Sequence, residues 1–96
     1  MNSLPNLPLF ALGQIVATPG ALALLEKAQK LPSEFLLRHL RGDWGDLCRD
    51  DQAENELSLK QGFRLLSSYP VTDTDTIWII TEADRSVTTV LLPAEY

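Results

Sequence analysis

The chain has 96 residues and a formal net charge of −5, from thirteen acidic and eight basic side chains. This length corresponds to a single domain, residues 1–96, and the charge argues against direct nucleic-acid binding, which needs clustered Lys and Arg. Hydrophobic residues make up 45% of the chain. No apolar run approaches the ~20 residues of a membrane-spanning helix. With Cys48 as the one cysteine, no intrachain disulfide can form. We therefore expect a soluble, cytoplasmic protein with no membrane contact.

The first half of the chain predicts a short strand followed by two helices. Residues 14–17 favour the strand, and Thr18 followed by Pro19 is typical of a helix start. Thr caps free backbone N–H groups, and Pro at the first helical position loses no needed hydrogen bond. A second helix is expected from Pro32. Gly42 suits the left-handed conformation that closes such a helix.

The middle of the chain predicts a third helix and a strand. Asp51 and Glu54 have the spacing of a capping box, so we expect Asp51 to be the N-cap and Gly62 to end the helix. Residues 63–69 then alternate in the manner of a strand. We expect one side of this strand to carry Phe63, Leu65, Ser67 and Tyr69.

The last third of the chain, Thr76–Tyr96, is the densest apolar segment and predicts the centre of the core. Residues 76–82 and 86–93 are rich in β-branched and aromatic side chains and flank a short polar connection, which is the pattern of a β-hairpin. A short connection from the preceding strand predicts three consecutive antiparallel strands. The expected fold is α+β: two or three helices packed on one face of a small antiparallel sheet of three or four strands, with a C-terminal β-hairpin.

The acidic stretch from Asp43 to Glu56 is the candidate protein-binding site. It combines a tryptophan with six carboxylates: Asp43, Trp44, Asp46, Asp50, Asp51, Glu54 and Glu56. One hypothesis is a surface for a basic partner, because carboxylates along a loop and helix can stand in for phosphates. The alternative is a solvated helix start, where acids complement the helix dipole. Trp44 is either an exposed interface anchor or a side chain folded back over the corner between the second and third helices.

Other candidate chemistry lacks the spacing that it needs. Neither His39 with Asp43 and Asp46 as metal ligands nor Cys48 with His39 as nucleophile and base matches a known motif. We expect no catalytic residue, no cofactor and no metal. His39 is expected on the surface near a helix C-terminus, Cys48 as an inert thiol, and Arg85 in a solvated hairpin turn with a local partner.

Several segments resemble a family of small proteins carried on plasmids and integrative elements of proteobacteria. They are residues 42–46, 62–69 and 78–93, and the resemblance extends to residues 9–21. Members are often labelled "plasmid-related protein" or "type I restriction endonuclease subunit M". The second label does not suit this chain, because a modification subunit needs a methyl-donor fold and an Asn-Pro-Pro-Tyr-type motif, which is absent.

The resemblance implies a setting on mobile genetic elements, where short acidic proteins often inhibit host defence. Our leading hypothesis is a non-enzymatic accessory protein that binds another protein through its acidic surface. The expected partner is a basic nucleic-acid-binding surface of a bacterial defence complex, which would make it an anti-CRISPR or anti-restriction protein. The alternative is a structural or regulatory interaction module without a defence role, either a homodimer or the partner of a co-encoded protein.

Overall fold

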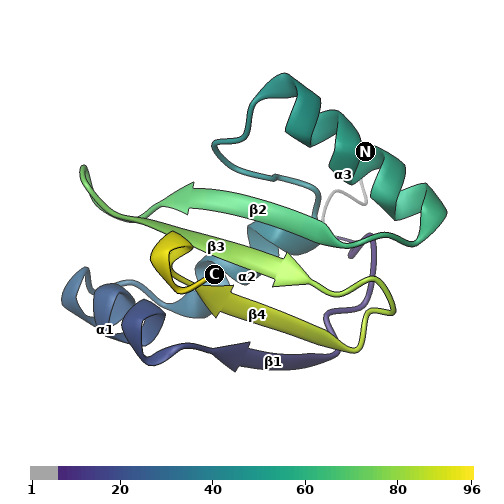
Figure 1. Cartoon of the computed structure of the whole chain (residues 1–96). Helices are drawn as coiled ribbons and strands as arrows, with labels where there is room; N and C mark the ends of the chain where they lie inside the picture. Colours follow the sequence, from purple (N-terminus) through teal and green to yellow (C-terminus); the bar gives the residue numbers. More distant parts are fainter. Residues whose placement is uncertain (1–6) are drawn as a thin grey trace.

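A four-stranded sheet with strand order β1-β4-β3-β2 lies at the centre of the fold (Figure 1). The computed structural model describes residues 7–96. Along this part of the chain the elements are β1 (Gln14–Ala17), α1 (Pro19–Lys27), α2 (Pro32–Leu40), α3 (Arg49–Gln61), β2 (Leu65–Pro70), β3 (Thr76–Thr81), β4 (Val87–Leu91) and a short 3-10 helix, η1 (Pro93–Glu95).

The predicted α+β class is confirmed, with one difference in the sheet. β2, β3 and β4 are consecutive antiparallel strands, as the hairpin pattern predicted. β1 pairs with β4 in parallel, so the sheet is mixed rather than wholly antiparallel. The whole chain from α1 to β3 separates these two strands. A local pattern can indicate that a segment is a strand, but it does not encode the direction of so distant a neighbour.

Three of the four predicted helix ends are confirmed. Thr18 Oγ1 accepts the backbone N–H of Ala21 at the start of α1, and Gly42 adopts a φ of +85° beyond the end of α2. Gly62 closes α3 with a φ of +78°. The predicted start of α3 was wrong: its N-cap is Cys48 rather than Asp51, and no side chain caps it. The acids of its first turn complement the dipole without capping it.

The apolar core lies between the sheet and the pair α1 and α2, which cover one face as expected. Alternation along β2 points Leu65, Ser67 and Tyr69 into this face, which confirms that they share one side of the strand, and all three are buried. Phe63 precedes the strand and is 53% exposed, so its predicted place on that side was wrong. The core cluster consists of Ala21, Leu25, Phe35, Leu36, Tyr69, Val71, Ile77, Ile79 and Val90.

α3 lies along the β2 edge of the sheet instead of on a face (Figure 1). Its buried residues are polar, Asn55 and Ser58. The Asn55 amide donates to the Leu66 carbonyl (2.6 Å) and accepts from the Leu66 N–H (3.1 Å), as a neighbouring strand would. The loop before α3 does the same at Ser68, whose N–H donates to Trp44 O and whose carbonyl accepts from Asp46 N–H. The outward backbone groups of β2 are thereby satisfied at these two residues.

We predict that Asn55→Ala lowers the free energy of unfolding by about 2 kcal/mol, because both backbone groups of Leu66 lose their partners while the adjacent open groove admits some water. Denaturant unfolding measures the change. Gln61→Ala, on an exposed position of the same helix, is the control and should stay within about 0.5 kcal/mol of the parent. Equal stability of the two variants would contradict this role for Asn55.

Candidate protein-binding surface

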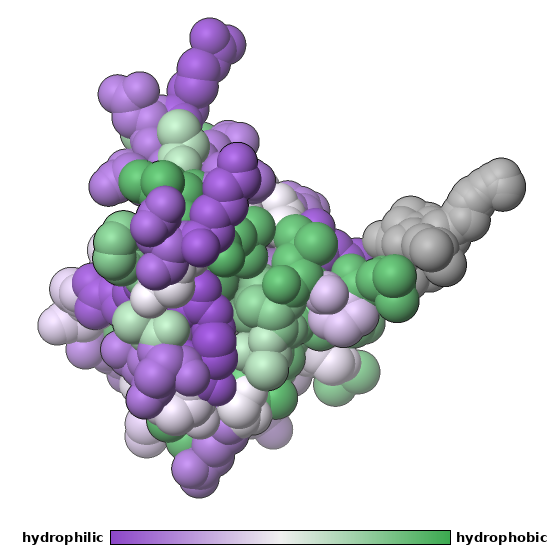
Figure 2. All heavy atoms as spheres, turned by 90° about the vertical axis from the view of Figure 1, so that its right-hand side faces the viewer, coloured by the Kyte–Doolittle hydropathy of each residue, from purple (hydrophilic) through white to green (hydrophobic). Residues whose placement is uncertain are grey.

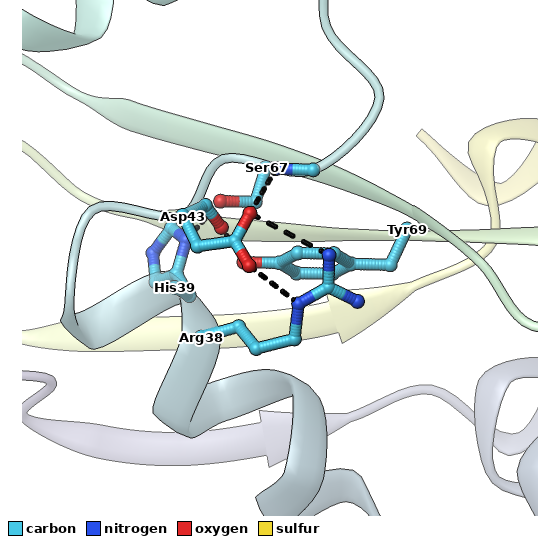
Figure 3. A network of polar contacts seen from close by, with 6 residues as sticks. Arg38, His39, Asp43, Ser67 and Tyr69 are labelled. Carbon is cyan, nitrogen blue, oxygen red and sulfur yellow. Dashed lines mark hydrogen bonds and ion pairs between the residues drawn. The ribbon is translucent and has the colours of Figure 1, made fainter.

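The loop between α2 and α3 is fixed by Asp43. Its carboxylate accepts a hydrogen bond from Arg38 Nε (2.7 Å) and another from the Gly45 N–H (3.1 Å). The Arg38 guanidinium lies over the ring of Tyr69, whose hydroxyl donates to the Asp43 carbonyl (Figure 3). The hydrogen bond from Arg38 lowers the pKa of the Asp43 carboxyl. Asp43 is therefore engaged within the chain, although its side chain reaches the surface.

Trp44 is folded into the corner between α2 and α3. Its side chain is 3% exposed, and its indole N–H donates to Glu56 Oε2 (2.9 Å). The indole also packs against the rings of Phe10 and His39. Of the two alternatives for Trp44, the exposed anchor is wrong and the folded-back side chain is right. The Glu56 carboxylate is committed to the same contact.

The other four acids of the predicted site are exposed and available to a partner. Asp50 and Asp51 lie in the first turn of α3, Glu54 in the next turn, and Asp46 in the loop before it. Within residues 7–96, none of these four carboxylates makes a hydrogen bond or an ion pair. The predicted set therefore divides into structural residues and a smaller group whose charge faces solvent.

A groove runs beside this smaller acidic group, between α3 and the segment that leads into β2. Its volume is about 460 Å³, and Asp51 and Glu54 lie on its α3 wall. Leu57 and Phe63 line it and are each about half exposed (51% and 53%). The remaining lining residues are Leu47, Asn55, Ser58, Arg64 and Leu66. In Figure 2 hydrophilic side chains dominate the top of the molecule, where α3 lies, with hydrophobic ones among them.

Sequence reasoning missed the apolar part of this surface, although one signal was present. The apolar residues of α3 form no single stripe, and the helix packs through polar residues instead. Leu57 is consequently left outside the core. Phe63 was assigned to the sheet, because alternation alone does not show where β2 begins. We name Asp46, Asp50, Asp51 and Glu54 together with Leu57 and Phe63 the α3 face.

The single histidine of the chain is completely buried, and the expectation of a surface histidine was wrong. His39 projects from the last turn of α2 toward the sheet. Its Nδ1 lies 2.5 Å from Ser67 Oγ on β2, and its Nε2 lies 2.9 Å from Thr81 Oγ1 on β3. Thr81 Oγ1 in turn lies 2.7 Å from Thr88 Oγ1 on β4. Four elements are thus joined by one chain of side-chain hydrogen bonds.

This chain of hydrogen bonds has one direction. The Thr88 hydroxyl donates to the Leu12 carbonyl (2.7 Å), which can only accept. Thr81 must therefore donate to Thr88 and accept from His39 Nε2–H. Nδ1 carries no proton and accepts from the Ser67 hydroxyl. Burial, and secondarily the charge of Arg85, lowers the pKa of His39 to about 4. The imidazole is neutral at neutral pH and cannot touch a substrate.

Arg85 connects the hairpin turn to the end of α3. Its guanidinium donates to the carbonyls of Glu82 and Ala83 within the turn, and it also reaches Phe63 O (2.7 Å) and Ser58 O (3.1 Å). The prediction of a local partner is confirmed, but the long-range contacts were not foreseen. Since Ser58 and Phe63 line the groove, Arg85 fixes one of its ends.

Three further observations concern the described residues. Cys48 is exposed at the N-terminus of α3, whereas His39 is buried. Among residues 7–96 no group of three His, Cys, Asp or Glu side chains could hold a metal ion. Within the same residues no helix is long and apolar enough to span a bilayer.

Comparison with known proteins adds no constraint on function. No protein-family model, no curated protein and no solved structure matches this chain. The similarity to proteins of mobile elements therefore stays a prediction, and the function has to be argued from the geometry of the α3 face.

We predict that stability falls as the pH is lowered from about 6.5 to about 4, because the unfolded chain binds a proton at His39 over this range and the folded chain does not. This difference between the pKa values of the unfolded and folded states contributes about 3 kcal/mol to the free energy of unfolding. The contribution is complete above the unfolded-state pKa and is lost as the pH falls toward the folded-state pKa. Denaturant unfolding at several pH values measures it, and His39→Gln is the control that should flatten the slope between pH 5 and 6.5. Because the chain has one histidine, its ring NMR signals report the titration directly. A midpoint near 6.5 would contradict the buried, neutral imidazole.

We predict that Arg85→Lys loosens the C-terminal end of α3, because an ammonium cannot reach carbonyls of the turn, Ser58 and Phe63 together. Amide hydrogen exchange at residues 58–63 should accelerate about 10-fold or more, the loss of a hydrogen bond from a charged donor. Lys60→Arg, a conservative change at an exposed position of α3, is the control. Unchanged exchange in the Arg85 variant would show that α3 is held without it.

Proposed function

We propose that this protein is a non-enzymatic binding module that docks its α3 face onto a basic surface of another protein. The observation that carries the proposal is the juxtaposition of unpaired carboxylates with half-exposed apolar side chains along one groove. Asp51 and Glu54 form one wall of the groove, and Leu57 and Phe63 lie beside them. A surface of this kind offers both charge and apolar contact to a partner.

The two kinds of side chain would contribute differently to binding. Exposed carboxylates accelerate encounter with a basic partner and fix its orientation, while adding modest affinity at physiological salt. Buried aromatic and aliphatic contacts supply most of the affinity in protein interfaces. Phe63 is the side chain best placed for this, because it is large and about half exposed. In this proposal the acids determine which partner binds, and the apolar contacts in the groove supply most of the affinity.

The non-enzymatic part of the proposal is supported by how the polar side chains are used. His39 is completely buried, and the carboxylates of Asp43 and Glu56 accept hydrogen bonds from Arg38 and Trp44. The four available acids of the α3 face are exposed to water, whereas general acids and bases usually act in sites shielded from it.

The partner that we propose is a nucleic-acid-binding surface of a bacterial defence complex of the CRISPR or restriction type. Carboxylates on a loop and the first turns of a helix can occupy sites built for phosphates. The resemblance of residues 42–46, 62–69 and 78–93 to proteins of mobile elements supports this setting. An interaction module without a defence role is the second candidate, and the sheet edge described below favours its homodimeric form.

The test is the triple variant Asp50→Lys, Asp51→Lys and Glu54→Lys. The tagged parent is used to capture partners from a bacterial lysate with active CRISPR and restriction systems, and the captured complex is then titrated. We expect near-stoichiometric recovery of one defence complex, and an affinity roughly 100-fold lower for the triple variant, because three attractive contacts become repulsive.

The matched control is Glu26→Lys, Asp73→Lys and Glu82→Lys, which changes the net charge equally at exposed positions outside the α3 face. It should bind within a few-fold of the parent at physiological salt, where distant charges are screened. Equal affinities for the parent and the first triple variant would overturn the α3 face as the interface. Recovery of no defence complex would overturn the proposed partner.

A further inference from the structure

The two edge strands of the sheet, β2 and β1, differ in whether their outward backbone groups have hydrogen-bond partners. The outward backbone groups of Leu66 and Ser68 on β2 are bonded by Asn55 and by the loop before α3. On β1, the N–H groups of Gln14 and Thr18 donate to the carbonyls of Ser86 and Val90 in the β4 segment. The backbone groups of the alternating residues, Ile15 and Ala17, therefore point away from β4 toward the open edge of the sheet. Within residues 7–96, the N–H and C=O groups of Ile15 and Ala17 have no partner on that side.

β1 is short, with four residues, but within the strand it has no charged side chain, no proline and no bulge to prevent pairing at its open edge. Folded proteins protect such edges with charges, proline, bulges or a covering segment. β1 reads Gln-Ile-Val-Ala, and no charged side chain precedes Glu26 in the sequence. Half of the exposed large hydrophobic residues in the described chain belong to this uncharged part: Leu7, Leu9, Ile15, Val16 and Leu22.

We propose that β1 pairs with β1 of a second copy of this chain, antiparallel and about a two-fold axis through Val16. The strand is self-complementary in that register. Ile15 and Ala17 both direct their backbone groups outward, and they lie symmetrically about Val16. Ile15 of each copy would therefore lie opposite Ala17 of the other copy as a hydrogen-bonded pair. The dimer would contain two such pairs, each with two N–H···O bonds.

The sequence also limits the length of this ladder. Continuing the same register places Gly13 opposite Pro19 of the second copy, and proline has no N–H to donate. Pairing thus ends where α1 begins, and the two sheets join into one of eight strands. Val16 would lie beside its own copy on the face opposite α1 and α2, and Ile15 would cover Ala17 on the helix-bearing face.

Charge favours a second copy over an acidic or basic partner at this edge. Four exposed acids belong to the α3 face, along the β2 edge, and two intervening strands separate that edge from β1. With strands spaced at about 4.8 Å, β1 and β2 are roughly 14 Å apart, beyond the Debye length of about 8 Å at physiological salt. Repulsion between the α3 faces of two copies therefore opposes self-association only weakly. The two α3 faces of the dimer would point away from each other at its ends.

Sedimentation equilibrium of the full chain tests the proposal. The parent should show concentration-dependent dimers, and Val16→Glu should raise the dissociation constant roughly 30-fold or more, because two carboxylates would face each other at the axis. Leu37→Glu is the matched control: it places the same charge at an exposed leucine on α2 and should leave the dimer within a few-fold of the parent.

The register is tested by disulfide formation in a Cys48→Ser background. Val16→Cys should form an intermolecular disulfide, because residues opposite each other in a non-hydrogen-bonded pair have Cα atoms about 4.5 Å apart. Ile15→Cys should not, since its own copy is diagonal at more than about 7 Å. A parent that is monomeric at all concentrations would overturn the proposal. So would a dimer that survives Val16→Glu, or one in which Ile15→Cys crosslinks as readily as Val16→Cys. None of these outcomes depends on the partner proposed for the α3 face.

Discussion

The buried imidazole of His39 needs a hydrogen-bond partner at each ring nitrogen, and this need fixes the geometry of the rest of the molecule. A polar group without a partner in the core would cost about 1–3 kcal/mol. Ser67 and Thr81 supply the two partners from β2 and β3, and Thr88 extends the chain to β4. The end of α2 can therefore dock in one place only. The apolar contacts of Phe35 and Leu36 alone would permit small sliding.

The position of the α3 face follows from that docking. Trp44 packs on the ring of His39, and its indole N–H holds Glu56 of α3. Asn55 then binds α3 to the β2 edge, and Arg85 holds its other end. Because these contacts are hydrogen bonds rather than an apolar stripe, the helix keeps its hydrophobic Leu57 at the surface. An α3 packed in the ordinary amphipathic manner would have no apolar groove to offer.

Polarity is distributed very unevenly between the two sheet edges. The β2 edge is covered by α3, which carries three exposed acids, whereas β1 has no charged side chain of its own and no covering segment within the described residues. Two interfaces can operate independently in such an arrangement, since screening separates them. The proposed dimer would present two α3 faces at once, so that a partner with two basic sites would be bound with an effective concentration advantage.

The sequence by itself determined the local elements: the cap formed by Thr18, the closing glycines Gly42 and Gly62, the alternation along β2, and the hairpin of β3 and β4. These depend on backbone preferences and on side-chain periodicity, which nearby residues encode. Only the tertiary structure decided that His39 is buried, because its partners lie 28 and 42 residues away. It likewise separated the acids into structural and available groups. Burial of a polar side chain depends on distant partners that satisfy it, and no local pattern contains them.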